Sequence, residues 1–408
     1  MGFDALTYVL AQKMGGGSSG GESMVTGQKI YGHVFSMPLP GGEKQYTLVI
    51  SQNNSVRGSG SLVTTYELGS ADRYSYGGDV PWNGQQFSGV TFDGDIKLAD
   101  ISYWFSGAYS YVNYTNLTTK KMVETHAGSS ISGGFPGGMP NGVEVMYKTF
   151  YETSGSYVNA VCPDSVRDFV SAYENSYTNR AACGNGVTNM YRSYYRSTIY
   201  KGPPVCGPNV IDMSFAYHNA DFRDKTNARP VCGDNVINMR DTYYGIRNLT
   251  GSPVCGNNVT NMYDAYTYCY NLTGQPVCGN NVTNMAFAYQ SCYNLTGSPA
   301  CGSNVKDISY AYSYCERLSG NSYFYSPNVG KASGCFEGCA SNNAINIYVK
   351  KDSQTFNTLM LTDYYSICGS PIEWSNEIET NGRYCCNKGQ IYVYPVDDVE
   401  AARIANGD

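Results

Sequence analysis

The sequence predicts a mainly β protein with short helices. We expect an N-terminal helix, an antiparallel β domain, a solenoid of repeats and a C-terminal β cap. The unit PVCGNNVTNM..AY..CYNLTG occurs twice within residues 253–297, 23 residues apart, with degraded copies on both sides. A fixed period in this range is typical of solenoids. Upstream of the repeats, short β-branched and aromatic runs separated by turn dipeptides predict strands.

The bulk composition excludes some function classes. The chain has 408 residues, enough for two or three domains, with 15% charged residues and a net charge of −6. This balance argues against a nucleic-acid or anionic-membrane surface, which needs clustered Lys and Arg. The start, MGFDALTYVLAQKM, lacks the basic and apolar runs of a signal peptide or membrane helix. We therefore expect synthesis in a reducing cytosol, with the 15 Cys acting as small apolar residues.

The first 14 residues predict one short helix. Phe3, Leu6 and Leu10 fall at i, i+3 and i+7 and share a face. Residues 15–23, which contain GGGSSGG, follow as a flexible linker. Because so short a helix is marginal in water, we expect a docking helix that orders on a partner; the alternative is a frayed terminus.

Residues 24–150 predict a β-sandwich or barrel-like domain with antiparallel strands. The expected strands are 30–37, 45–51, 61–68, 95–105 and 143–151, which are rich in β-branched and aromatic residues. No long helical pattern separates them, which favours an antiparallel arrangement.

Residues 151–342 form the repeat region, with about eight coils. Apolar residues recur in columns, and columns that stay apolar in a solenoid face its core. The Val column is Val166, Val187, Val210, Val236, Val259, Val282, Val305 and Val329. The aromatic column seven residues later is Tyr173, Tyr194, Tyr217, Tyr243, Tyr266, Tyr289, Tyr312 and Phe336. The residues between them include a Met column, and a Cys column precedes the Val column.

The spacing within a coil predicts its local structure. Met, Tyr and Cys lie 4 and then 3 residues apart, as at Met262, Tyr266 and Cys269, which is the spacing of a helical face. Pro253 forbids a helix in the preceding PVCG segment. We therefore expect one short strand at PVCG and one short helical or 3₁₀ turn per coil. Asn or Asp before each Met should satisfy backbone groups in tight turns. Residues 343–408 leave the repeat and predict the β cap that covers the last coil.

The repeat resembles bacterial leucine-rich repeats of the BspA type, including the variant built on VTNM..MF..C..L. The matching residues here are Val259-Thr260-Asn261-Met262, Ala265-Tyr266, Cys269 and Leu272, and again Val282 through Leu295. The resemblance covers about 180 residues and implies a right-handed horseshoe or rod with a parallel sheet on one face. Members of this family are mostly surface or adhesion proteins. The chain departs from it in having Cys at the usual Leu or Ile strand position and no secretion signal.

The N-terminus is similar to those of phage virion proteins. In these proteins a short FDALTY-like helix and a Gly linker precede β-rich fibre, tail or head-decoration modules. Together with the adhesion-type repeat, this resemblance implies a virion protein whose N-terminus binds other virion proteins. A homo-oligomer, with a trimer as one form, is the assembly we expect on the particle.

A candidate recognition surface comes from the positions that vary between coils while their neighbours stay fixed. Variation of this kind indicates side chains that need no common core shape, and exposed aromatic rows suit a host-surface glycan or protein. An ordinary solenoid surface is the alternative. The candidate residues are Tyr191, Arg192, Tyr195, Phe215, Tyr244, Tyr263, Tyr268, Phe287, Tyr310 and Tyr314.

No pattern in the sequence predicts chemistry. His33, His126 and His218 are scattered, and no CxxC pair suggests zinc, so we expect no catalytic residues, metal or cofactor. The function expected is that of a bacteriophage virion structural protein, in a fibre, tail or head decoration, that presents its solenoid for host-surface binding. The alternatives are a bacterial cell-surface BspA-like adhesin and a fibre-borne polysaccharide depolymerase.

Overall fold

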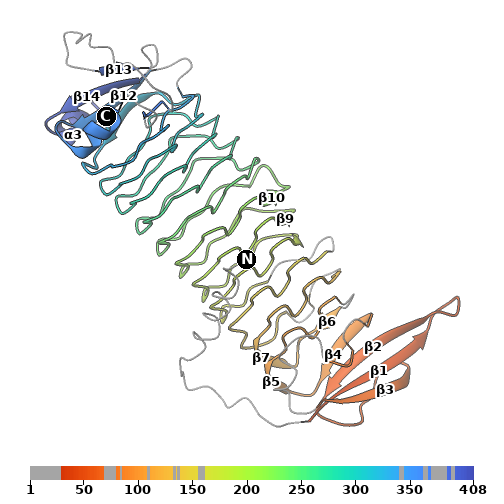
Figure 1. Cartoon of the computed structure of the whole chain (residues 1–408). Coiled ribbons are helices and arrows are strands. Elements are labelled where there is room, and N and C mark those ends of the chain that lie inside the picture. The colour runs from red at the N-terminus through yellow and green to blue at the C-terminus, as the bar shows by residue number, and fades with distance from the viewer. Residues whose placement is uncertain are drawn as a thin grey trace.

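The computed structural model of the protein (Figure 1) describes residues 29–68, 80–82, 85–107, 111–131, 135, 138–154, 161–339, 344–361, 366–368, 384–386 and 391–408. Its strands are β1 (Ile30–Pro38), β2 (Lys44–Ser51), β3 (Ser61–Leu68), β4 (Gly89–Asp93), β5 (Ile96–Asp100), β6 (Val112–Asn113), β7 (Leu117–Lys121), β8 (Tyr177–Thr178), β9 (Thr198–Ile199), β10 (Asp221–Phe222), β11 (Gly320–Phe324), β12 (Ile345–Lys350), β13 (Tyr384–Cys386) and β14 (Ile391–Val396). Its helices are α2 (Gln354–Leu359) and α3 (Val399–Ala405).

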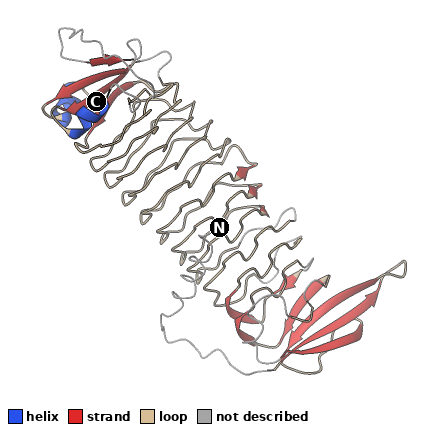
Figure 2. Cartoon of the chain, in the orientation of Figure 1, coloured by secondary structure: helices blue, strands red, loops and turns tan. Residues whose placement is uncertain are grey.

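The prediction of a mainly β protein with short helices is confirmed (Figure 2). The expected docking helix and linker, with Phe3, Leu6 and Leu10, lie outside the described residues. Within the described residues, no helix has the length and apolar character needed to cross a membrane.

The first sheet is mixed and open, which corrects the expected antiparallel sandwich or barrel. Its strand order is β3-β1-β2-β4-β6. β1 pairs antiparallel with both β2 and β3, whereas β2–β4 and β4–β6 are parallel. β3 lies on the outer side of β1, so the chain reaches the free edge of β2 by a long connection that allows β4 to run parallel to it. Short β-branched runs predict strands but do not set their direction, and this is why the sequence missed the parallel pairs.

Beyond this sheet the chain forms a stack of coils joined by parallel bridges (Figure 1). β5 pairs with β7, and the ladder then continues through one bridge per coil, from Lys121↔Val145 and Val145↔Asp168 to Asp307↔Lys331. The hydrogen bonding does not change near residue 150, where the repeat was expected to start. Residues 143–151, expected as a strand, instead supply a bridge at Val145 followed by a turn.

Each coil turns without a helix, contrary to the expected helical or 3₁₀ segment. In one coil the N–H groups of Met262, Asp264, Tyr266 and Tyr268 donate to carbonyls of the next coil at 2.8–3.1 Å. The N–H groups of Ala265 and Thr267 between them donate three residues back within the coil. An α-helix would use all of these amides internally. The helical prediction failed because the amides instead alternate between turn and ladder.

Left-handed residues produce this alternation. Asp264 and Tyr268 have φ of 54° and 63°, and the equivalent residues of other coils are also left-handed. Asn261, two residues before Tyr263, accepts the N–H of Tyr263 on its side-chain oxygen at 3.1 Å. This bond confirms the predicted role of the Asn and Asp column. The PVCG segments, expected as strands, lie outside the named strands; the short strands β8–β10 follow the turns instead.

A column of aromatic rings runs through the core of the stack. Val259, Met262, Tyr266 and Cys269 are all fully buried, as their columns predicted. The rings of Tyr243, Tyr266 and Tyr289 stack at 5.4 Å with interplanar angles of 11° and 3°. The same column extends upstream as stacked rings of Phe105, His126, Phe150 and Tyr173.

The tyrosine hydroxyls of this column bind backbone. Tyr266 accepts the N–H of Val254 at 3.1 Å and donates to the carbonyl of Val254 at 2.7 Å. The tyrosines from Tyr173 to Tyr312 repeat this pair of bonds with the residue 12 positions earlier. These bonds hold the PVCG segment of each coil against the core, since they satisfy a backbone pair that lies outside the ladder.

The cysteines of the repeat pack as thiols. All the cysteines whose side chains the structure describes are free of disulfides. Cys269 donates to the carbonyl of Tyr243 at 3.0 Å, and burial raises the pKa of the Cys206 thiol to about 11. Buried thiols with raised pKa values are poor nucleophiles.

The C-terminal segment continues the stack and covers its end. β11, within the last coils, pairs parallel with β12, β12 with β14, and β13 antiparallel with β14. Thr355 and Thr358 of α2 bind the N–H and the carbonyl of Val329, the last residue of the Val column, at 2.9 and 2.8 Å. The carbonyl of Ile367 accepts the N–H of Phe336 at 2.8 Å. Backbone groups that would form the next rung of the ladder are thereby satisfied.

Candidate binding face

Two positions in each coil have a left-handed backbone conformation. They are the left-handed residues two positions after the Met column and two positions after the Tyr column, such as Asp264 and Tyr268. Aromatic residues and arginines at these positions are half-buried or exposed, whereas Asp241 is buried. Among the predicted recognition residues, Arg192, Phe215, Tyr268, Phe287, Tyr310 and Tyr314 occupy such positions, with φ between 55° and 63°.

The first aromatic row comprises Tyr191, Phe215, Arg240, Tyr263, Phe287 and Tyr310. Tyr191 and Phe215 make an edge contact at 5.7 Å. The Arg240 guanidinium lies 5.6 Å from the Phe215 ring centre and 5.0 Å from that of Tyr263, taking the place of a ring. Tyr263 contacts Phe287 at 5.6 Å, and Phe287 stacks on Tyr310 at 5.0 Å. The row is therefore continuous across six coils.

The second aromatic row comprises Tyr195, His218, Tyr244, Tyr268, Tyr270 and Tyr293. Tyr195 stacks on His218 at 4.9 Å, and His218 on Tyr244 at 4.4 Å with an interplanar angle of 3°. Tyr244 then meets Tyr268 edge-on at 5.4 Å, with an interplanar angle of 86°. Tyr270 stacks on Tyr293 at 5.1 Å. We call the two rows together the aromatic face.

The structure places eight of the ten predicted recognition residues in the two rows. Tyr191, Phe215, Tyr263, Phe287 and Tyr310 belong to the first row, and Tyr195, Tyr244 and Tyr268 to the second. The Arg192 guanidinium lies 4.3 Å from the Tyr195 ring centre. Nine of the ten are half-buried against their neighbours, and only Tyr314 is exposed, at 42%. Tyr314 lies in the same coil as Tyr310 and donates to Glu337 of the next coil at 3.1 Å. The sequence argument did not select His218, Arg240, Tyr270 or Tyr293, although all four occupy positions that vary between coils.

Buried acids lie beneath the face. Glu174 is 5% exposed and binds Arg192 at 2.6 Å. Asp241, also 5% exposed, binds the Arg240 guanidinium at 3.1 Å and lies 3.6 Å from His218 Nδ1. Burial raises the pKa of Asp264 to about 6. The acids thus fix the orientation of the arginines that lie over the rings.

A hollow of about 360 Å³ interrupts the second row at Gly245. Arg196, Asn219 and Tyr268 occupy the same left-handed position in neighbouring coils, but Gly245 has no side chain to fill its place. A Cβ there would come within 2.0 Å of Asn219 Oδ1. The hollow is lined by Asn219, Tyr244, Gly245, Arg247, Tyr268 and Tyr270.

A groove of about 730 Å³ lies on the side of the coils that carries the bridge ladder. Ile211 and Ile237, which are 46% and 44% exposed, lie in it beside the equivalent Thr188 and Thr260. An Asn row borders it, and Asn258 Nδ2 donates to the carbonyl of Asp234 in the preceding coil at 2.9 Å. Sequence reasoning missed this groove, although the residue after each Val also varies between Arg, Thr, Ile and Lys.

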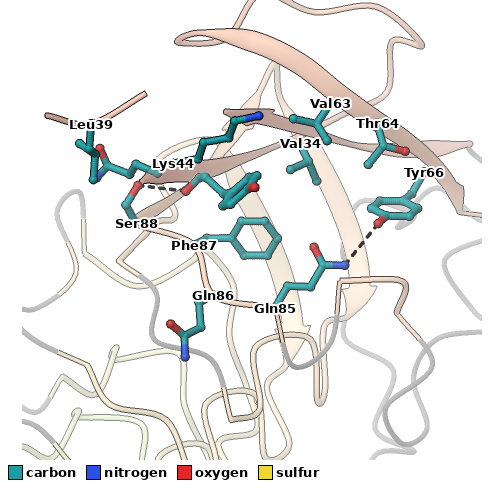
Figure 3. A pocket seen from close by; sticks show the side chains of 12 residues that line it. Val34, Leu39, Lys44, Val63, Thr64, Tyr66, Gln85, Gln86, Phe87 and Ser88 are labelled. Carbon is teal, nitrogen blue, oxygen red and sulfur yellow. Dashed lines mark hydrogen bonds between the residues drawn. The ribbon is translucent and has the colours of Figure 1, made fainter. Parts of the chain in front are cut away.

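A third hollow, of about 630 Å³, lies on the first sheet (Figure 3). In it Gln85 Nε2 donates to the Tyr66 hydroxyl at 3.3 Å, and Ser88 Oγ donates to the carbonyl of Tyr46 at 3.0 Å. Its lining residues are Val34, Leu39, Lys44, Gln45, Tyr46, Val63, Thr64, Tyr66, Gln85, Gln86, Phe87 and Ser88. Within the described residues, no group of three or more His, Cys, Asp or Glu side chains could hold a metal ion.

Comparisons of the chain with protein families, with curated proteins and with solved structures found no match.

Proposed function

We propose that the stack of coils is a solenoid of the BspA-type leucine-rich-repeat kind, and that it serves host-surface binding in a bacteriophage virion protein. The fold proposal is supported by the unbroken parallel ladder and by the buried Val, Met, Tyr and Cys columns. The virion proposal rests on the N-terminal sequence, whose apolar residues Phe3, Leu6 and Leu10 we propose to dock on other virion proteins. A homo-oligomer, with a trimer as one form, would present several copies of the aromatic face at once.

Bulky rings at left-handed positions are the observation that carries the binding role. Left-handed backbone costs roughly 1–2 kcal/mol for a residue with a Cβ, and Asn, Asp and Gly bear it best. Asn219, Asp264 and Gly245 hold these positions in some coils. Others hold aromatic residues instead, namely Phe215, Tyr268, Phe287, Tyr310 and Tyr314.

Strain retained on a surface points to function, since packing alone does not require it. The five aromatic residues lie outside the core columns, because they are half-buried or exposed whereas the Met and Tyr columns are fully buried. Rigid aromatic rings supply contact area at low cost in side-chain entropy, which suits recognition of a glycan or protein. Binding requires no chemistry in this account, and multivalent display on a particle would raise the overall affinity.

Two experiments test the proposal. Mass spectrometry of purified phage particles should detect the full chain, and a variant lacking residues 1–21 should fold but be absent from particles. Detection of the chain in bacterial envelopes and not in particles would instead favour an adhesin. Labelled full-length protein should bind host cells, and Tyr268→Asn with Phe287→Asn should reduce that binding by about 10-fold or more, since each lost aromatic anchor typically costs at least 1 kcal/mol. Equal binding of this double variant would contradict the role of the face.

A further inference from the structure

We propose that the hollow at Gly245 binds an acidic sugar residue, a hexuronic or sialic acid, through its carboxylate. This inference rests on the proposed host-surface binding and names the ligand class that one point of the aromatic face would select. It follows from three features of the hollow, namely an arginine without an acidic partner, a corner of tyrosine rings, and a position left empty by glycine.

Arg247 supplies the charge. Arg192, Arg223 and Arg240 each pair with a carboxylate, at 2.6, 2.9 and 3.1 Å. Arg247 takes part in none of the ion pairs found among the described residues, and its guanidinium lies 5.6 Å from the Tyr270 ring centre. A guanidinium without an acidic partner keeps its donors available for a carboxylate, which it can bind through two parallel hydrogen bonds.

The tyrosines supply a shaped wall. The planes of Tyr244 and Tyr268 meet at 86°, and those of Tyr268 and Tyr270 at 75°. Tyr244 is supported from behind by His218, stacked at 4.4 Å. The tyrosines line the hollow mainly with polar atoms, which can hydrogen-bond to the hydroxyl groups of a sugar.

Two acids lie near the hollow without lining it. Asp241 and Asp264 occupy the position two residues after the Met column, whereas the hollow opens at the position two residues after the Tyr column. Burial raises the pKa of Tyr244, which lines the hollow, and the charges of Asp264 and Asp241 raise it further. Arg240 pairs with Asp241 and offsets its charge. A cationic ligand, which an aromatic corner could otherwise attract, would be repelled by Arg247.

The volume of the hollow suits a single sugar residue. The volume of about 360 Å³ lies near the lower end of the roughly 300–1,000 Å³ of small-molecule sites. Asn219 adds a side-chain amide at the rim, and its Oδ1 overlies Gly245. The absence of a side chain at Gly245 is therefore what keeps the hollow open between Asn219 and Tyr268.

The test uses the full-length chain and an array of uronic- and sialic-acid oligosaccharides, each beside its carboxyl-reduced neutral form. At least one acidic oligosaccharide should bind, and its reduced form about 10- to 100-fold more weakly, the range expected for a charged hydrogen bond. Arg247→Gln should cause a similar loss for the acidic form and little for the neutral one. Gly245→Asn, which keeps a residue suited to positive φ, should fill the hollow and weaken binding by about 10-fold or more.

Control variants come from elsewhere in the stack of coils. Gly338, with φ of 67°, occupies the same column away from the hollow, and Arg317 is an exposed arginine of another coil. Gly338→Asn and Arg317→Gln should bind like the unaltered protein. The proposal is overturned if no acidic oligosaccharide binds, if neutral and acidic forms bind equally, or if Arg247→Gln has no effect. If host-cell binding still depends on Tyr268 while Arg247→Gln is silent, this inference fails and the proposed function stands.

Discussion

The buried hydroxyl of Tyr266 offers a direct test of how the coils hold together. The Tyr266→Phe substitution keeps the ring and its stack at 5.4 Å on Tyr243 and Tyr289. It removes both hydrogen bonds to Val254, at 3.1 Å from its N–H and 2.7 Å to its carbonyl. The backbone pair of Val254, in a half-buried segment, then loses both of its protein partners.

The magnitude follows from these two bonds. A buried polar group without a partner costs about 1–3 kcal/mol, and the N–H is the more demanding of the pair. We expect the free energy of unfolding of the coil to fall by about 2–3 kcal/mol. Local opening should therefore become about 30- to 150-fold more frequent, since 1.4 kcal/mol corresponds to a factor of ten.

Native-state hydrogen exchange of the Val254 amide measures this opening. The amide should exchange about 30- to 150-fold faster in Tyr266→Phe than in the unaltered protein. Tyr263→Phe in the same coil is the control, because within the described residues the hydroxyl of Tyr263 has no hydrogen bond. An exchange rate within about threefold of the unaltered protein, or an equal change in the control, would refute the reasoning.

Three further predictions concern strain, protonation and close packing. Phe287→Asn should change the free energy of unfolding, measured by denaturant titration, by less than about 1 kcal/mol, because relief of backbone strain at φ of 60° offsets the lost ring contact. A loss of stability above about 2 kcal/mol would contradict the strain argument. Burial lowers the pKa of His126 from 6.5 to about 3, so the unfolded chain binds the extra proton and stability is lost as pH falls from 6.5 toward 3. Tm measured at pH 7 and pH 4 should therefore differ less in His126→Phe, and an unchanged difference would contradict the neutral imidazole. Gly302→Ala places a Cβ 2.4 Å from the carbonyl oxygen of Gly279 and should lower Tm more than Gly279→Ala, whose nearest contact is 3.3 Å; equal effects would argue against close packing at Gly302.

The columns of the repeat could be predicted from sequence because burial repeats where the residue type repeats. Val259, Met262, Tyr266 and Cys269 are buried as expected. The backbone between them was wrong for a physical reason. Two successive turns, each with a left-handed residue, bury positions 4 and then 3 apart, the same spacing as a helix. Sequence spacing therefore fixes which side chains face the core but not how the amides are used.

The upstream part of the ring column and the bonds of the tyrosine hydroxyls were not predicted from the repeat pattern. Phe105, His126 and Phe150 continue the ring column upstream, but their coils carry no PVCG segment and no Tyr in the column, so alignment on the repeat missed them. A spacing of 12 residues, as between Val254 and Tyr266, recurs from coil to coil. Only the structure shows that the tyrosine hydroxyl binds the backbone at that distance along the chain.

The candidate residues of the face were found for a different reason. Positions such as Phe287 and Tyr310 change between coils, and variable positions in a repeat lie outside its core. Sequence variation alone did not reveal that Arg240 and His218 link the rings, because an arginine and a histidine in these positions suggest an ordinary polar surface. The contacts between coils depend on stacking geometry, which the sequence does not encode locally.

Binding to host cells tests the central claim, that the aromatic face and not the groove on the ladder side recognises the host. Labelled full-length protein should be compared with Tyr268→Asn/Phe287→Asn and with Ile211→Thr/Ile237→Thr, which copies the threonine found in equivalent coils. We predict that the first pair reduces binding by about 10-fold or more while the second leaves it unchanged. Loss of binding in the groove variant, with full binding retained in the aromatic variant, would contradict this account.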